Sequence, residues 1–218
     1  MKKKTVLLAL IVLTMVGCTN NKKDNKQTKE IEIITLQPLQ ENETLCYEDE
    51  FRRISGSWAE NYDGFIIRVE AKREDVKSFT VQDATAFECV VADALILSNG
   101  TSNVRTLNVY DLNSCDELLS IKDNFSGEVM PDDNQTGFTF YKYSEDMPIV
   151  QWNAQTGEWH ETNKVPSELF NSDFHNTIEE IGDRAFNGMR LAALQKTYVN
   201  IENKKISYLN EYKWKYIE

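Results

Sequence analysis

The residues best suited to proton transfer or metal binding are the two histidines of the chain, His160 and His175. His160 stands between Trp159 and Glu161, so a catalytic role would require partners that the fold brings from elsewhere. The sequence contains no HExxH, CxxC, GxSxG or SxxK motif and no glycine-rich phosphate loop. We therefore predict no catalytic residue, no cofactor and no metal site. The alternative is a hydrolase in which the fold assembles two carboxylates or a site around His160.

Two acidic stretches offer oxygen atoms of the kind that calcium binds. They are "DLNSCDE", with Asp111, Asn113, Asp116 and Glu117, and "MPDDNQTG", with Asp132, Asp133 and Asn134. Neither stretch has the spacing of an EF-hand loop. Asp and Asn are also common in tight turns, because their side chains accept hydrogen bonds from the nearby backbone. We interpret both stretches as turns between strands.

Aromatic side chains are the third group of candidate functional residues, because they could bind a ligand. In "GFTFYKYSEDMPIVQW", Phe138 and Phe140 fall on one face of a predicted strand, and Tyr141 and Tyr143 fall on the other. One face must pack into a core, and the other could stack against a sugar ring or a partner chain. The candidate binding residues are Phe138, Phe140, Tyr141, Tyr143, Trp152 and Trp159.

The elements that must position these residues are predicted to be short strands. In "FIIRVEAK", Phe65, Ile67 and Val69 share one face, and "VKSFTVQD" repeats the alternation. The stretch "AFECVVADALILSNG" has no helical stripe and ends in the turn signal Asn99-Gly100, so we predict two strands there.

Three later stretches share one format, an alternating strand, a polar turn and a second alternating strand. They are "LNVYDLNSCDELLSIKD", "PIVQWNAQTGEWHETN" and "TYVNIENKKISYLNEYKW". We predict a β-hairpin from each, and a mainly β fold built as an antiparallel sandwich, a barrel or a meander of hairpins. The format also resembles single hairpins of β-propeller blades, although Cys115 stands where such turns usually carry Gly. A small β-propeller-like fold is therefore the alternative.

One segment departs from the strand pattern. Apolar residues recur at helical spacing in "SDFHNTIEEIGDRAF", at Phe174, Ile178, Ile181 and Ala185. The spacing predicts one helix near residues 173–186 that covers an end of the sheet, with Ser172 or Asp173 as its N-cap. In the preceding "KVPSELF", Pro166 is expected to open a short helical turn.

The start of the chain is typical of an exported protein. Lys2, Lys3 and Lys4 precede an apolar run over residues 6–16 that only Thr14 interrupts. This run is shorter than the roughly 20 apolar residues of a membrane-spanning helix, so it indicates a secretory signal peptide. Its last residues, Met15-Val16-Gly17-Cys18, resemble the lipobox of bacterial lipoproteins, with Met where Leu is usual.

That resemblance covers only the first 18 residues and implies a lipid anchor. Residues 1–17 would be removed, and Cys18 would carry a diacylglyceryl group and an acylated amino terminus. Several acyl chains on one residue hold a protein stably on a membrane. Residue 19 is Thr rather than the Asp that retains lipoproteins in the inner membrane of Gram-negative bacteria, which favours the outer membrane.

Charge and composition limit what the rest of the chain can bind. Residues 18–30 are polar and predict the lipidated cysteine followed by a flexible tether, and residues 31–218 predict a single β-rich domain. Loss of residues 1–17 removes three lysines and no acids, which changes the formal net charge from −11 to −14. Because an acidic surface repels phosphate backbones, we expect no nucleic-acid partner.

These observations predict a membrane-anchored envelope lipoprotein that acts as a non-catalytic binding module for a glycan, a peptide or another envelope protein. Its membrane contact would be the anchor on Cys18. The envelope hydrolase described above is one alternative, and a purely structural or assembly lipoprotein is another.

Overall fold

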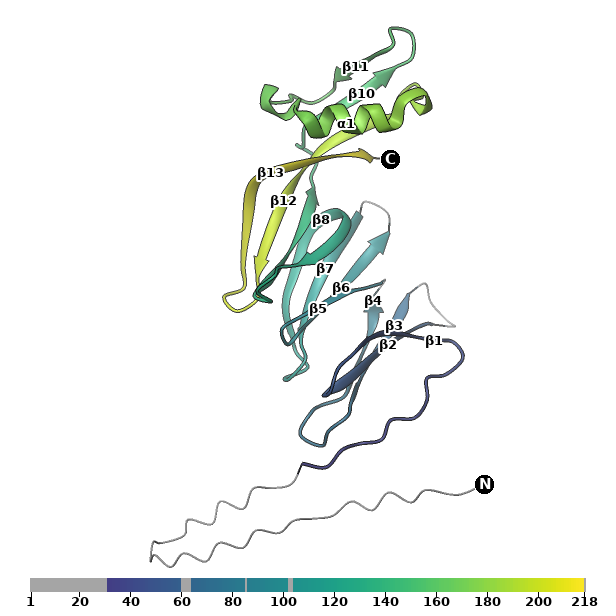
Figure 1. The fold of residues 1–218 in the computed structure, drawn as a ribbon, viewed down its shortest axis with the longest axis vertical. Helices are drawn as coiled ribbons and strands as arrows, with labels where there is room; N and C mark the ends of the chain where they lie inside the picture. Colours follow the sequence, from purple (N-terminus) through teal and green to yellow (C-terminus); the bar gives the residue numbers. More distant parts are fainter. Residues whose placement is uncertain (1–30, 60–63, 85, 102–103, 218) are drawn as a thin grey trace, which may run out of the picture. The chain divides into compact units, whose positions relative to one another are not determined.

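The computed structural model describes residues 31–217, apart from residues 60–63, 85 and 102–103 (Figure 1). The predicted signal peptide, Cys18 and the predicted tether lie outside the described residues. The described residues belong to one unit, Ile31–Glu218, and this unit is mainly β, as the alternation predicts. Its helices are too short and too polar for any of them to span a membrane, within the residues described.

The first four strands form an antiparallel sheet in the order β1-β2-β3-β4. These strands are β1 (Glu43–Glu48), β2 (Arg52–Trp58), β3 (Phe65–Ala71) and β4 (Phe79–Ala84). The predicted alternation in β3 is confirmed, because Ile67 and Val69 are fully buried while Arg68 and Glu70 are partly exposed.

The remaining strands form a nine-stranded sheet, also antiparallel, in the order β11-β10-β12-β9-β8-β7-β6-β5, with β13 paired to β12. Their bounds are β5 (Ala86–Val91), β6 (Ala94–Thr101), β7 (Val104–Asp111), β8 (Glu117–Pro131), β9 (Gly137–Tyr143), β10 (Ile149–Asn153), β11 (Glu158–Glu161), β12 (Arg190–Asn200) and β13 (Lys205–Ile217). The strand pair β5–β6 and the three predicted hairpins, β7–β8, β10–β11 and β12–β13, are confirmed.

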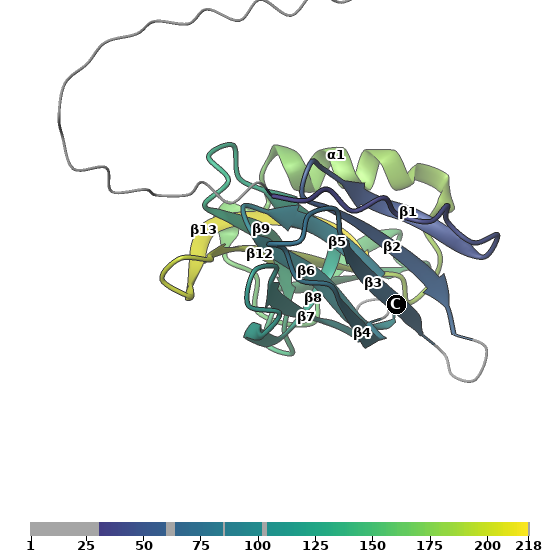
Figure 2. The same cartoon turned by 90° about the horizontal axis from the view of Figure 1, so that it is seen from below.

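The small sheet packs against the β5–β7 end of the nine-stranded sheet (Figures 1 and 2). Apolar side chains of the two sheets form one buried cluster there. Ile54, Ile67 and Val69 of the small sheet meet Leu95 and Leu97 of β6. Ile96, between those two leucines, points the other way into a second core formed with β7, β8, β9 and β12. Because β6 is covered on both faces, its sequence "ALIL" lacks the alternation of a half-buried strand.

The described strands thus form a sandwich built from a meander of hairpins. Neither sheet closes into a barrel, and the strands are shared between two sheets rather than among radially arranged blades. The sandwich and meander prediction is confirmed, and the propeller alternative is not supported.

The predicted helix is confirmed as α1 (Ser172–Ile181), which continues into the 3-10 turn η2 (Gly182–Arg184). Its N-cap is Asn171 rather than the predicted Ser172 or Asp173, because the Asn171 side chain accepts hydrogen bonds from the N–H groups of Asp173 and Phe174, at 3.0 and 3.2 Å. Pro166 precedes a second 3-10 turn, η1 (Ser167–Leu169). Both η1 and α1 lie over the end of the nine-stranded sheet, where Leu169 and Phe174 pack with Leu191 and Trp214.

Candidate ligand-binding site

The six aromatic residues predicted to bind a ligand fall into three different environments. Phe138 and Phe140 are fully buried, and Phe140 packs against Phe125 with ring centroids 5.9 Å apart. Side chains with no exposed surface offer nothing to a ligand, so the prediction of a binding role for these two residues is corrected: they belong to the core of the sheet.

Tyr141 and Tyr143 lie on the opposite face of β9 and are half-buried. They pack against a smaller apolar cluster that includes Ile149 and Leu194. This face is therefore partly core as well, and the two tyrosine side chains keep part of their surface exposed.

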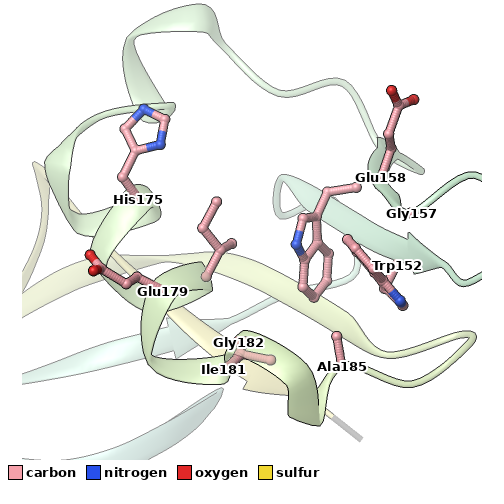
Figure 3. A pocket seen from close by; sticks show the side chains of 10 residues that line it. Trp152, Gly157, Glu158, His175, Glu179, Ile181, Gly182 and Ala185 are labelled. Atoms are coloured by element: carbon pink, nitrogen blue, oxygen red, sulfur yellow. The ribbon is translucent and has the colours of Figure 1, made fainter.

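Trp152 and Trp159 are the two candidates that the fold brings together. They are directly opposite each other in the β10–β11 register, and their ring centroids are 5.4 Å apart at an interplanar angle of 57°. Both indoles are half-buried. They form one wall of a cavity of about 530 Å³ between the hairpin and α1 (Figure 3).

We call this cavity the aromatic pocket. It is lined by residues of β10, β11, the turn between them, α1 and η2, namely Trp152, Gly157, Glu158, Trp159, His175, Ile178, Glu179, Ile181, Gly182 and Ala185.

The helical wall of the aromatic pocket comes from the apolar stripe that the sequence predicts. Phe174 points inward and is buried, whereas Ile178, Ile181 and Ala185 are only partly covered. Residues three and four apart lie on one face of a helix, so the stripe that begins in the core ends in the pocket. Helical spacing predicts that these four residues share one face. It does not show which of them other elements cover and which remain accessible.

The helix is held in place by β13. The carboxylate of Asp173 accepts a hydrogen bond of 2.7 Å from the backbone N–H of Trp214. The Trp214 indole donates to the carbonyl oxygen of Leu169, also at 2.7 Å, and packs against Phe174 with ring centroids 4.8 Å apart at an interplanar angle of 57°. These contacts fix the helical wall relative to the sheet from which the hairpin extends.

The polar side chains of the aromatic pocket lie at its edges. Glu158 is on the hairpin side, and His175 and Glu179 are on the helix side, where their polar groups do not point toward Glu158 (Figure 3). All three are solvent-exposed. A glycosidase-like mechanism requires two carboxylates that face one bond across a short gap, so this arrangement does not favour the hydrolase alternative.

His160 does not line the aromatic pocket. Its Nε2 atom is 3.0 Å from the hydroxyl of Thr156, and its side chain is exposed. The neighbouring Glu161 instead accepts a hydrogen bond from the backbone N–H of Val165. Among the residues that the structure describes, the side-chain hydrogen bond of His160 is to a hydroxyl and not to a carboxylate that would orient it for acid–base catalysis.

The two acidic stretches form turns. Asp111 accepts hydrogen bonds from the backbone N–H groups of Asn113 and Ser114, at 2.6 and 3.0 Å. Asp132 accepts from the backbone and hydroxyl of Thr136 and from the Tyr198 hydroxyl. Within the described ranges, no three His, Cys, Asp or Glu side chains are grouped so that they could hold a metal ion.

Comparisons with known proteins add no family. No protein-family model and no curated protein sequence matches the chain.

Proposed function

We propose that this protein is an envelope lipoprotein, anchored to a membrane through Cys18, whose folded domain is a non-catalytic binding module. Its binding site is the aromatic pocket, and its ligand is an uncharged glycan. The anchor rests on the lipobox-like Met15-Val16-Gly17-Cys18 and the apolar run before it. The absence of Asp after the cysteine favours the outer membrane.

The observation that carries the binding role is the pair of half-buried indoles in a preformed cavity. Large aromatic faces favour flat apolar surfaces such as the C–H face of a sugar ring. At the pocket edge, the carboxylates of Glu158 and Glu179 can accept hydrogen bonds from sugar hydroxyls. The same two carboxylates disfavour an anionic ligand.

The binding proposal is tested by a thermal-shift screen of the full-length protein in a polyoxyethylene detergent. The panel contains neutral oligosaccharides, which should shift the melting temperature, and anionic peptidoglycan fragments, which should shift it less. A ligand present at 100 times its dissociation constant stabilises the folded state by about 2.7 kcal/mol, which is a measurable increase in melting temperature.

Two tryptophan variants make this screen specific. Trp159→Ala removes one of the two indoles that form a wall of the aromatic pocket and should abolish the shift. Trp58→Ala is the matched control, because Trp58 is 62% exposed and lies in the four-stranded sheet. A ligand that stabilises Trp159→Ala as much as the unmodified protein would show that it binds elsewhere.

The anchor is tested separately. Intact mass spectrometry of the membrane-extracted protein should show a chain that starts at Cys18 and carries diacylglyceryl and acyl groups. Cys18→Ser should release the protein from the membrane fraction. An unmodified chain that starts at another residue would contradict the lipoprotein assignment and leave the binding proposal intact.

A further inference from the structure

A second pocket lies on the same nine-stranded sheet, away from the indole pair. Its volume is about 270 Å³, and its residues come from β8, β9 and β13. We call it the lysine pocket, and it is lined by Gly127, Glu128, Met130, Tyr141, Lys213 and Lys215. It shares no lining residue with the aromatic pocket.

An irregularity in β8 builds this pocket. The pairing of β8 with β9 jumps from Ser126↔Tyr141 to Met130↔Thr139, so three residues of β8 oppose a single residue of β9. Such bulges bend a strand and redirect its side chains, and they are common beside functional sites. Gly127 and Glu128 of this irregular segment, with Met130 after it, form one side of the pocket.

Gly127 is required for this geometry. Its φ of +88° is left-handed, and a Cβ atom added there would lie 2.1 Å from the Lys215 ammonium nitrogen. The Lys215 ammonium group therefore occupies the space that the missing side chain leaves. Behind the bulge, Arg105 donates a hydrogen bond to the Gly127 carbonyl oxygen, and its own charge is paired with Glu88 at 3.2 Å.

The two lysines come from alternate positions of β13 and so point to one face of the sheet. Each ammonium nitrogen is 6.0 Å from the centroid of the Tyr141 ring. Other lysines of this sheet are paired with acids, as in Lys142–Asp123 at 3.2 Å and Lys196–Glu211 at 2.8 Å.

Lys213 and Lys215 differ from those paired lysines. Among the described residues, neither forms an ion pair with a carboxylate. Glu128 lines the same pocket, but its side chain is solvent-exposed. Burial lowers the pKa of Lys215, and the charges of Lys213 and Arg105 lower it further, while Glu128 opposes the shift. Lys213 and Lys215 are therefore two neighbouring positive charges for which the described residues supply no ion-paired carboxylate.

We propose that the lysine pocket binds an oxyanion, the phosphate or carboxylate group of a small ligand, between the ammonium groups of Lys213 and Lys215. Charge-assisted hydrogen bonds from ammonium groups to such oxygens are short and strong. The site does not depend on the proposed function, because the aromatic pocket has acidic edges and favours an uncharged ligand.

Inorganic phosphate is the first probe. Proton–nitrogen correlation spectra of the full-length protein in an uncharged detergent are recorded at constant ionic strength, with chloride replaced stepwise by phosphate. Saturable shifts are expected at the amides of Gly127, Glu128 and residues 213–215. Shifts that increase linearly without saturation, or that spread over the whole surface, would overturn the proposal.

The variants separate binding from folding. Lys213→Gln and Lys215→Gln should each weaken phosphate binding by about tenfold. Lys204→Gln, in the exposed β12–β13 turn, is the matched control and should leave it unchanged. Glu128→Gln removes the only carboxylate among the lining residues and should tighten binding by about two- to fivefold, a gain that a misfolded protein cannot show. Unchanged affinity in both Lys213→Gln and Glu128→Gln would refute the site.

A second ligand distinguishes two sources of the oxyanion. Glycerol 3-phosphate carries the phosphate of a lipid headgroup. Tighter binding of glycerol 3-phosphate than of inorganic phosphate would assign the pocket to an esterified phosphate, and equal binding would assign it to the free anion. Either outcome supports the pocket as an oxyanion site, whereas failure of both ligands to shift its amides would overturn the proposal.

Discussion

The indole nitrogen of Trp214 donates a hydrogen bond of 2.7 Å to the carbonyl oxygen of Leu169. Both residues are buried, and the contact joins the last strand of the chain to the turn before α1. With the Asp173 carboxylate on the Trp214 backbone N–H, it determines where the helical wall of the aromatic pocket stands.

Replacement of Trp214 by Phe should destabilise the protein. A phenylalanine ring keeps part of the apolar contact, but it leaves the buried Leu169 carbonyl without its donor, which costs about 1–3 kcal/mol. Urea unfolding followed by circular dichroism measures the change. Tyr216→Phe is the control, because Tyr216 is 44% exposed, and it should change stability by about 0.5 kcal/mol or less. Equal stability of the two variants would contradict the role given to the indole hydrogen bond.

Replacement of Cys115 by Gly should stabilise the protein by about 0.5–1 kcal/mol, measured as a higher melting temperature. Cys115 has a φ of +71° in the β7–β8 turn, a conformation in which a side chain is strained and glycine is not. Its side chain is half-exposed, so little packing is lost. Cys115→Ala keeps the Cβ atom and should give no such gain. A gain of the same size in the alanine variant would assign the effect to the thiol and not to the backbone.

Cys89 should resist alkylation in the folded protein. Burial, with a smaller effect from the charge of Glu88, raises the pKa of this thiol from 9.0 to about 12. Because only the thiolate reacts, the rate at pH 8 should be about a thousandfold lower than for the same thiol in urea. Mass spectrometry of peptides after timed exposure to iodoacetamide gives both rates. Similar rates with and without urea would contradict the raised pKa of Cys89.

The raised pKa of Cys89 also predicts that the protein loses stability in alkaline solution. Since the folded-state pKa of Cys89 lies above the unfolded value of 9.0, its contribution is fully present below pH 9 and is lost as the pH rises toward 12. The difference in urea midpoint between pH 8 and pH 10 should be smaller in Cys89→Ala than in the unmodified protein. An equal difference in both would show that other groups cause the loss.

Asp132 should contribute to stability in neutral but not in acidic solution. Hydrogen bonds from the Thr136 hydroxyl, followed by those from the Thr136 backbone and the Tyr198 hydroxyl, lower the pKa of Asp132 below 3.8. Its contribution is therefore present above about pH 4 and is lost as the pH falls through the folded-state pKa. Asp132→Ala should be destabilised at pH 7 and should differ less from the unmodified protein at pH 2, in thermal unfolding. Asp133→Ala, at the exposed neighbour, should match the unmodified protein at both pH values.

The local elements of this fold could be predicted because their signals are local. Alternation at Ile67 and Val69 marks a half-buried strand, and Asp111 and Asp132 mark turns because their carboxylates bond to the backbone a few residues away. The helix follows from the spacing of Phe174, Ile178 and Ile181. Its N-cap was misplaced by one or two residues, because Asn171, Ser172 and Asp173 are all good capping residues and the sequence does not rank them.

The role of each aromatic face could not be predicted in the same way. Period two shows that Phe140 and Tyr141 point to opposite faces, but not which face another layer covers. In the structure, Phe140 is fully buried and Tyr141 reaches a pocket edge. Similarly, Trp152 and Trp159 are neighbours because they face each other in one hairpin, which is a local relationship. Their position opposite Ile178 depends on the packing of α1 against β13, which is not local.

The sequence by itself therefore determined the strands, the hairpins, the helix and the candidate aromatic residues, because each depends on side-chain spacing within about 20 residues of chain. Only the tertiary structure decided which aromatic rings are core and which line a pocket, and only it joined Lys213 and Lys215 to the bulge at Gly127. The physical reason is that burial and charge pairing are set by segments distant in sequence. Packing decides which face of a strand such a segment covers. The side-chain periodicity within the strand does not contain that information.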